Sequence, residues 1–449
     1  ASTSYVDGQG VIDLYIAIPG LLSSSISQDT VLPGWGHSPP FLLPTFAMFR
    51  YARAFKPLSQ RMLQRHLSST DTPPKTAVVM LNMGGPNDLD EVGPFLQNLF
   101  SDGEIITLGP LQNILGPLIS TRRTPAIKEQ YAQIGGRSPI GLWTKEQGEG
   151  MVKRLDEISP ETAPHKAYTM FRYAAPLTEE TLLAMKRDGC TRAVAFSQYP
   201  QFSCTTTGSS LNHLWRELKR LDMGTDFEWS VIDRWPTHDG FLSALTERVQ
   251  AGLDDFCETV RDQVVVVFSA HSLPMKVVNR GDQYVPEVAA TANAVMDRLK
   301  WCNRHVMAWQ SQVGPLPWMG PQTGDVIKGL AKQGHKHVLA VPIAFTSDHV
   351  ETLFEIDIEY KEEADEVGLD FRRSESLNGS PLIIKAQADI VAEHLRSGEV
   401  CTPQYRMNCA NCVNPTCRTI INPVGGEYQR LRDQAKGVST PKTTAELRG

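Results

Sequence analysis

No stretch of this 449-residue sequence is both long enough and apolar enough to cross a membrane as a helix. The best apolar run, Val11 to Leu22, is short and contains Asp13, whereas a spanning helix needs ~18 or more apolar residues. Any contact with a membrane is therefore expected to be peripheral.

Positive charge is also scarce, because 44 Lys and Arg stand against 50 Asp and Glu, for a net charge of -6. Proteins that bind nucleic acid usually carry a basic patch or stripe, and none is evident beyond the N-terminal region, so we expect no nucleic-acid partner. With 41% hydrophobic and 21% charged residues, the chain has the composition of a globular protein. Its length allows two or three domains.

The basic residues that do cluster lie near the N-terminus. Residues 48–70 contain no acidic residue, and apolar residues interleave with five basic ones: Arg50, Arg53, Lys56, Arg61 and Arg65. This pattern is typical of a mitochondrial presequence; the alternative is a disordered basic arm. Residues 1–47 contain no Lys or Arg and fit neither interpretation, so Met48 is a candidate true start. We expect residues 1–72 to form an N-terminal extension that includes the presequence.

The body of the chain alternates short apolar runs with longer helical patterns, which predicts an α/β fold with doubly wound parallel sheets. Runs such as VVVVF are apolar on both faces, as buried parallel strands are. We expect two Rossmann-like units, at 73–245 and 246–400, with a cleft between them. The expected strands are Ala77–Asn82, Tyr168–Tyr173, Ala193–Gln198, Trp229–Asp233, Val264–Ser269, Val306–Gln310 and Val338–Phe345, and two of the helices are Glu179–Asp188 and Leu211–Leu221.

Four polar motifs follow expected strands. LNMGGP follows the first strand, QYPQFSC the third, SAHSLP the VVVVF strand and TSDH the LAVPIAF strand. In open α/β sheets, ligands bind beyond the carboxyl ends of the strands, so one cleft is expected to collect all four motifs.

Two histidines lie at such strand ends, His271 in SAHSLP and His349 in TSDH. Imidazole changes charge near neutral pH, so it suits proton abstraction or metal ligation. A single histidine at a strand end is more often structural, but a second one at an equivalent position favours function.

After TSDH the sequence predicts a helix, with Ser347 or Asp348 as its N-cap. Acidic residues recur on one face of this helix, and like charges at this spacing repel unless a cation lies between them. No Lys or Arg lies between Asp348 and Tyr360. One interpretation is a solvated acidic face, and the other is a carboxylate ladder that passes Fe²⁺ or another divalent cation inward to His271. The acidic residues are Asp348, Glu351, Glu355 and Glu359.

Other features give weaker signals when each is taken alone. Gly84 and Gly85 in LNMGGP predict a tight turn, but the motif is not the G-x-G-x-x-G of dinucleotide sites. Arg122 and Arg123 offer forked donors for carboxylates. The segment 95–119 is rich in apolar residues, and it is either a lip for a flat apolar ligand or membrane surface, or part of the core. Trp309 and Trp318 are candidate walls of an aromatic pocket, although buried tryptophan is commoner.

Cysteine is concentrated near the C-terminus. Cys409, Cys412 and Cys417 fall within nine residues, a spacing that favours a zinc or iron–sulfur site. Either site needs a fourth ligand, for which Cys401, Cys204 and a histidine are the candidates. We expect residues 401–420 to form a cysteine-cluster segment and residues 421–449 a polar tail.

Taken together, these motifs resemble those of the ferrochelatase family in its mitochondrial, animal-type form. The resemblance runs from about Lys75 to Cys417. Its ordered strings are LNMGGP, RRTP, IGGRSPI, FRYAAPLTEE, QYPQFSCTTTGSS, IDRWPTH, FSAHSLPM, VGPLPWMGPQT, VPIAFTSDHVETLFEIDIEY and ESLNGSPL.

The resemblance implies insertion of Fe²⁺ into protoporphyrin IX, with release of two protons, as the last step of haem synthesis. His271 is similar to the family's proton acceptor, and Glu351, with His349, Glu355 and Glu359, to its acidic path. Positions matching the family's porphyrin pocket, propionate side and apolar lip are Met83, Leu96, Leu99, Phe100, Ile119, Arg123, Tyr131, Ser138, Arg172 and Tyr199.

The resemblance also implies a [2Fe-2S] cluster on Cys204, Cys409, Cys412 and Cys417, so Cys204 becomes the preferred fourth ligand. A homodimer on the matrix face of the mitochondrial inner membrane is implied as well. Two alternatives remain. One is a chelatase for another metal or tetrapyrrole, such as coproporphyrin, and the other is a non-catalytic iron–sulfur or haem-binding protein.

Overall fold

The structure, a computed structural model, describes residues 75–106 and 108–402. The expected presequence, the cysteines Cys409, Cys412 and Cys417, and the polar tail lie outside the described residues.

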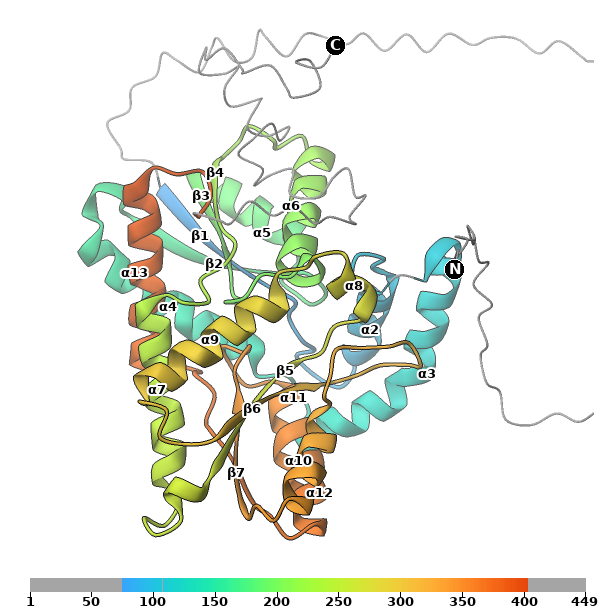
Figure 1. The fold of residues 1–449 in the computed structure, drawn as a ribbon. Helices are drawn as coiled ribbons and strands as arrows, with labels where there is room; N and C mark the ends of the chain where they lie inside the picture. The colour runs from blue at the N-terminus through green and yellow to red at the C-terminus, as the bar shows by residue number, and fades with distance from the viewer. Residues whose placement is uncertain (1–74, 107, 403–449) are drawn as a thin grey trace, which may run out of the picture. The chain divides into compact units, whose positions relative to one another are not determined.

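Two four-stranded sheets, both entirely parallel, organise this part of the chain (Figure 1). The first has the order β2-β1-β3-β4 and the second β6-β5-β7-β8. Numbered within its own half, each sheet therefore reads 2-1-3-4. The strands are β1 (Lys75–Asn82), β2 (His165–Phe171), β3 (Cys190–Ser197), β4 (Glu228–Ile232), β5 (Val265–His271), β6 (His305–Gln310), β7 (His337–Pro342) and β8 (Asp370–Arg373).

All seven expected strands are present, and the prediction of an α/β fold with parallel sheets is confirmed. The eighth strand, β8, was missed because its four residues, DFRR, include three charged side chains and give no apolar run. Its pairing with β7 supplies the edge that sequence pattern did not show.

Helices connect the strands and cover the sheets. They are α2 (Val92–Ser101), α3 (Gln112–Gln133), α4 (Ile140–Ile158), α5 (Thr178–Arg187), α6 (Ser209–Arg220), α7 (Asp239–Asp254), α8 (Met275–Asn279), α9 (Tyr284–Arg298), α10 (Thr323–Lys332), α11 (Val350–Leu353), α12 (Lys361–Glu366) and α13 (Pro381–Ser397). Two π-helical segments, η4 (Cys204–Gly208) and η6 (Glu355–Tyr360), and three short 3₁₀ turns complete the set: η2 (Gly109–Leu111), η3 (Pro160–Thr162) and η5 (Arg261–Gln263).

The alternation of side chains along each strand divides the core into layers. In β1, Val78 and Met80 point to one face, whereas Ala77, Val79 and Leu81 point to the other. The first face shares a single apolar cluster with β5 and β7 and with helices α4, α7, α9 and α13. Helix α13 lies beside α4 and α7 (Figure 1), so the last long helix closes this shared layer.

Each sheet changes direction between its two central strands, β1 and β3 in the first sheet and β5 and β7 in the second. These are the points at which α/β sheets open a crevice for ligands. The four polar motifs follow these four strands and no others. The strand order therefore places each motif beside a point at which such a crevice opens.

Two features concern the boundaries of the halves. Helix α7 runs without a break across residue 245, so a linker between the halves would have to lie before Asp239 or after Asp254. After α13, the chain returns to the first sheet, where the Val231 N–H donates to the Val400 carbonyl (2.8 Å) and the Thr402 N–H to the Val231 carbonyl (3.0 Å). This return adds one short bridge at the open edge of β4.

Candidate active site

His271 is the last residue of β5, where the buried VVVFSA run ends and the side chain reaches solvent. Its Nδ1 lies 2.6 Å from the carbonyl oxygen of Ser272. A carbonyl only accepts, so Nδ1 carries the proton in the neutral ring and Nε2 is the basic nitrogen. Nε2 faces Glu351, at 3.6 Å from its Oε1. The Trp318 ring is next to the imidazole, with centroids 6.3 Å apart.

His349 holds Glu351 from the other side. Its Nδ1 lies 3.1 Å from the Ser347 carbonyl and its Nε2 lies 3.3 Å from Glu351 Oε2. Both of its partners are acceptors, so the protonated ring can donate to each of them. Burial lowers the pKa of His349, but the Glu351 carboxylate outweighs burial and the net shift is upward.

Glu351 therefore lies between two imidazoles. Burial raises the pKa of this carboxyl, but the charge of His271 and the hydrogen bond and charge of His349 lower it below its ordinary value. The carboxylate is held in its ionised form beside the basic nitrogen of His271. A group in that state can receive a proton or stabilise a positive charge on the imidazole.

Glu355 is the next carboxylate along the segment, in η6. Its Oε2 accepts from Gln310 Nε2 at 3.0 Å and from Ser311 Oγ at 2.5 Å. The Gln310 amide is oriented by Ser269, whose hydroxyl donates to Oε1 at 2.6 Å. Burial and then the charge of Glu351 raise the pKa of Glu355 to about 7, against the effect of the two donors.

The helix after TSDH differs from the expected one. Its N-cap is His349, not Ser347 or Asp348, and it continues as α11, η6 and α12 instead of one α-helix. Asp348 is also not part of a common acidic face with Glu351. Its carboxylate accepts from Thr352, Arg373, Ser376 and Asn378, because a buried carboxylate needs donors and these surround it.

An apolar cluster borders this group. It contains most of the expected lip and pocket residues and also Val350, the first residue of α11. The segment that carries Glu351 therefore begins in contact with the lip. The members predicted from sequence are Met83, Leu96, Leu99, Phe100, Ile119 and Tyr131.

Burial varies along the segment 95–119, for which the sequence left a lip and a core as alternatives. Leu96 and Phe100 are buried, as residues of a core are. The apolar side chains that reach solvent lie where η2 leads into α3. Leu111, the last residue of η2, and Ile114 and Leu118 of α3 are 51%, 68% and 62% exposed. They recur at helical spacing, so they form one exposed stripe.

Two tyrosines belong to the surroundings of Glu351. Burial and the charge of Glu351 raise the pKa of Tyr131 and of Tyr199. The charge of Glu351 therefore acts on one tyrosine of α3 and on one in the loop after β3.

The remaining pocket candidates hold other groups. Arg123 lies over the Phe100 ring, 5.6 Å from its centroid. Arg172 pairs with the buried Asp102 at 2.7 Å, and Asp102 also accepts from Tyr173 and Ser209. This salt bridge fixes the orientation of the Arg172 guanidinium.

The LNMGGP turn is tight for a packing reason. A Cβ at Gly84, whose φ is +80°, would lie 2.8 Å from the Phe171 side chain, and one at Gly85 would lie 2.5 Å from Ser138. The close approach that the two glycines predicted is therefore to the protein's own side chains. Ser138 fixes the turn that presents Met83.

Trp309 differs from the expectation of a pocket wall. It is 3% exposed and packs against Tyr284 in the shared core layer, with ring centroids 6.0 Å apart. Only Trp318 of the pair lies at His271.

Cys204 begins η4, at the N-terminal end of α6. Its Sγ lies 3.5 Å from Arg280 Nη2, and its backbone N–H donates to Asp282 at 2.7 Å. Cys401, the competing fourth ligand, is 8% exposed within the apolar cluster on the outer face of the first sheet.

Sequence reasoning missed three residues that build the site, Gln310, Ser311 and Arg373. Gln310 did carry a signal, since it ends an expected strand directly opposite His271 in the register of β5 and β6. Ser311 has a φ of 65°, and such conformations cluster at functional sites. Arg373 gave no signal because its strand was not predicted.

Within 75–106 and 108–402, no three His, Cys, Asp or Glu side chains are grouped so as to hold a metal ion. In the same part of the chain, no helix has the length and apolar character of a membrane span.

Comparison with known proteins gives concordant results. A family model described as Ferrochelatase matches residues 75–395. The mitochondrial ferrochelatase of Bos taurus is 57% identical over 347 residues, which cover 77% of this chain and 83% of the bovine protein. That of Homo sapiens is 56% identical over 347 residues, covering 77% and 82%. That of Schizosaccharomyces pombe is 53% identical over 348 residues, also covering 77% and 82%.

A solved structure described as SirB from Bacillus subtilis with Fe³⁺ aligns with a TM-score of 0.42 at 12% identity, over 73% of this chain and 98% of that one. The family assignment rests on the sequence matches, which extend over most of both chains. By the family model and by these relatives, the chain belongs to the ferrochelatase family, the metal chelatases that insert Fe²⁺ into protoporphyrin in the last step of haem synthesis.

Proposed function

We propose that His271 removes the pyrrole protons of protoporphyrin IX in this chain and that Glu351 and Glu355 receive them. A flat porphyrin points two N–H groups into the ring, so a hydrated cation cannot enter. Both protons must leave, the macrocycle must bend, and Fe²⁺ must lose water. Strain from binding supplies a few kcal/mol of this cost, and a positioned base accelerates proton transfer ~10²–10⁴-fold.

One observation carries the proposal, the 3.6 Å approach of His271 Nε2 to Glu351 Oε1. That carboxylate can receive a proton from His271 or act as the counter-charge of the ring during proton transfer. Glu355, with a pKa of about 7, is suited to hold a proton near neutral pH. Glu359 is exposed, so the series Glu351, Glu355 and Glu359 leads from the interior to solvent, for protons or for the substrate iron.

We place the porphyrin against the apolar cluster that borders this group. Met83 and Tyr199 lie at the ends of β1 and β3, and the lip residues and Tyr131 line the α2–α3 side. Arg123 is our candidate for a propionate because its guanidinium, which lies over the Phe100 ring, keeps its five donors in a fork. Arg172 and Ser138 are assigned supporting roles, and Trp318 a place beside His271.

We further propose that Cys204, Cys409, Cys412 and Cys417 hold a [2Fe-2S] cluster. Among the described residues, Cys204 fits this role, because a guanidinium beside the sulfur favours the thiolate that a cluster requires. Cys401 fits it poorly because its side chain lies in an apolar core. When bound, the cluster supplies metal–thiolate bonds that fasten the C-terminal segment, and its binding energy counts as folding energy.

A series of contacts connects the end of the described chain to the loop before Cys204. Thr402 Oγ1 donates to Asp233 at 2.8 Å, and the neighbouring Arg234 pairs with Glu287 at 2.6 Å. Glu287 in turn accepts from the Phe202 N–H, two residues before Cys204. These contacts support a C-terminal segment that docks near the QYPQFSC loop.

The relatives named above are mitochondrial enzymes, which supports a mitochondrial location for this chain. We propose a homodimer that associates peripherally with the matrix face of the inner membrane through the exposed stripe of α3. The division into an N-terminal unit at 73–245 and a C-terminal unit at 246–400 stays a proposal as well.

The test of the function is metal insertion by the purified chain. Loss of protoporphyrin IX fluorescence on addition of Zn²⁺, or an absorbance shift with Fe²⁺ under anaerobic conditions, is the expected result. A parallel assay with coproporphyrin shows which of the two porphyrins is the better substrate. Faster insertion into coproporphyrin would replace the proposed substrate, and tight porphyrin binding with no insertion would leave a binding protein.

A further inference from the structure

The segment from Asp348 to Asp357 carries His349, Glu351 and Glu355, yet little in its own conformation holds it in place. It consists of the four-residue helix α11 and the first part of the π-helix η6. A single helical turn is unstable by itself, and π-helical hydrogen bonding is rare and confined to short pieces. Contacts from outside the segment must therefore fix the positions of its three acid–base groups.

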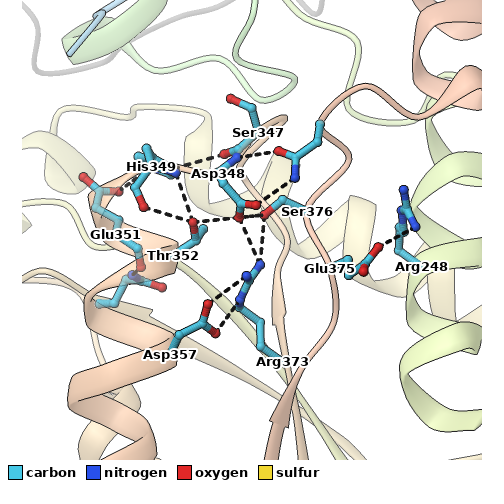
Figure 2. Close-up of polar contacts among 12 residues, drawn as sticks. Arg248, Ser347, Asp348, His349, Glu351, Thr352, Asp357, Arg373, Glu375 and Ser376 are labelled. Carbon is cyan, nitrogen blue, oxygen red and sulfur yellow. Dashed lines mark hydrogen bonds and ion pairs between the residues drawn. The ribbon is translucent and has the colours of Figure 1, made fainter. Parts of the chain in front are cut away.

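One side chain supplies contacts at both ends. Arg373, the last residue of β8, extends toward the segment and lies between Asp348 and Asp357 (Figure 2). Its Nε and Nη2 donate to the two oxygens of Asp357, at 2.6 and 2.8 Å. Its Nη1 donates to Asp348 Oδ1 at 3.1 Å and to Ser376 Oγ at 3.2 Å. The guanidinium thus bridges two carboxylates that are nine positions apart.

The Asp348 end is fully bonded. Its carboxylate accepts from Thr352, Ser376 and Asn378 as well as from Arg373, and its backbone N–H donates to Asn378 Oδ1 at 2.8 Å. The Thr352 hydroxyl also accepts from the His349 N–H at 3.1 Å. Because Asp348 immediately precedes His349, a displaced Asp348 displaces the imidazole that holds Glu351.

Charge gives the same residue a second effect. Arg373 and Asp348 are both largely buried, with side chains 13% and 14% exposed. Burial lowers the pKa of Arg373, but Asp357 and Asp348 outweigh it, so the guanidinium stays charged. Its charge offsets part of the charge of two carboxylates that take no part in the proposed chemistry. Glu351 is paired instead with His271 and His349, and Glu355 accepts from Gln310 and Ser311.

We propose that Arg373 is a positioning residue for metal insertion, which clamps both ends of the segment 348–357 so that Glu351 and Glu355 stay aligned with His271. This inference rests on the acid–base role proposed above. Arg373 does not contact the porphyrin in this proposal. A change at Arg373 should therefore alter turnover and not substrate binding. Lysine can replace it only in part, because an ammonium lacks the planar fork that reaches two carboxylates at once.

The experiment compares four full-length variants, Arg373→Gln, Arg373→Lys, Asp357→Asn and Arg248→Gln. Arg248 is the matched control, since it forms a 2.8 Å ion pair with Glu375, two residues from Arg373, but contacts no residue of the segment (Figure 2). Each variant is scored by its melting temperature, its protoporphyrin affinity from fluorescence titration, and its kcat for Zn²⁺ insertion per porphyrin-binding molecule.

We expect kcat to fall on the order of 10- to 100-fold in Arg373→Gln, as a small displacement of catalytic groups produces. Arg373→Lys should recover only part of this loss, Asp357→Asn should lose less, and Arg248→Gln should match the wild type. Protoporphyrin affinity should be unchanged in all four. If Arg373→Gln does not fold, Asp357→Asn and Arg373→Lys, each of which keeps a cation at the buried Asp348, still test the clamp.

Three outcomes would overturn the inference. The first is a normal kcat in Arg373→Gln, and the second is a loss in kcat that Arg248→Gln shares. The third is a loss that follows the fraction of folded protein alone. Metal insertion by the wild-type chain is the separate check on the proposed function. If the wild type inserts no metal, the proposed function is wrong regardless of the results for the Arg373 variants.

Discussion

The basic nitrogen of His271 lies 3.6 Å from a carboxylate oxygen of Glu351, and His349 contacts the other oxygen of the same carboxylate at 3.3 Å. One buried carboxylate is thus shared by two imidazoles that come from different strand ends. In the proposed function, the first ring exchanges protons while the second helps to keep the carboxylate ionised.

Replacing His271 tests the base directly. We expect His271→Ala to lower kcat for metal insertion by ~10²–10⁴-fold, the usual contribution of a general base, while the chain still binds protoporphyrin. Stopped-flow or fluorescence assays of Zn²⁺ insertion measure the rate, and His335→Ala is a control histidine outside the site. Near-normal turnover in His271→Ala would remove the assignment.

Glu351→Gln keeps the shape of the side chain and removes its charge. Because the neutral amide cannot stabilise a protonated His271, we expect kcat to fall on the order of 10²-fold with little change in protoporphyrin affinity. Steady-state rates and fluorescence titration separate the two effects. A change in melting temperature with normal kcat would show that the carboxylate is structural.

We predict that kcat depends on pH through Glu355, and the sign of this dependence follows from the pKa of about 7 of its carboxyl group. Below that value the carboxyl is protonated and cannot accept a proton, so kcat should fall as the pH drops from 8 to 6. Ser311 donates a hydrogen bond that lowers the pKa, so Ser311→Ala should move the fall in kcat to higher pH. Glu355→Gln should abolish this part of the pH profile.

The pH–rate profiles of wild type, Ser311→Ala and Glu355→Gln provide this measurement. Ser243→Ala is a matched control, since its hydroxyl bonds only within and beside α7. An identical profile in wild type and Glu355→Gln would contradict the prediction.

We predict that the charge of Asp102 raises the free energy of unfolding in a pH-dependent way. Burial raises its pKa, but Arg172, Tyr173 and Ser209 outweigh burial and hold the pKa below its ordinary value of 3.8. A lowered folded-state pKa stabilises the fold above the unfolded value, and this stabilisation is lost as the pH falls through the folded value. Asp102→Asn should cost ~3–5 kcal/mol at pH 7, since it leaves Arg172 unpaired.

Urea denaturation at pH 7 and near pH 3 measures that cost. The difference in unfolding free energy between wild type and Asp102→Asn should shrink at the lower pH. A difference that is equal at both values would mean that the charge of Asp102 does not matter to the fold.

The cysteine ligands predict a spectroscopic result. If Cys204, Cys409, Cys412 and Cys417 hold the cluster, Cys204→Ser should eliminate the visible iron–sulfur absorbance and lower stability. Cys401→Ser should keep the absorbance, because Cys401 lies in the core of the first sheet. Absorbance and circular dichroism of anaerobically purified protein decide between them. The opposite pattern, with Cys401 essential, would indicate a local four-cysteine site.

Sequence pattern predicted the strands because buried parallel strands are continuous apolar runs. His271 and His349 were found for a related reason, since a polar residue directly after such a run is conspicuous. Strand β8 and Arg373 were not found, because a short edge strand of charged residues has no apolar signature. Because the contact of Asp348 with Arg373 was not foreseen, Asp348 was interpreted as one member of an acidic face.

The N-cap and the helix type were also beyond sequence reasoning. Ser347 and Asp348 are better N-caps by preference than His349, but the Asp348 carboxylate is bonded by three donors from outside the helix, Arg373, Ser376 and Asn378. A π-helix depends on tertiary contacts and has no composition of its own. Local preference was overruled in both cases by contacts with residues distant in sequence.

The bridge between Val231 and the stretch Val400–Thr402 bears on how the chain reaches its native state. A ribosome synthesises β4 about 170 residues before the stretch that pairs with it. During synthesis or import, the N–H and C=O groups at this edge of β4 therefore stay unpaired until that stretch is available. Exposed strand edges invite pairing with other chains. The first half therefore depends on the last residues of the second to protect it, and chaperone binding to the incomplete chain would have a defined target there.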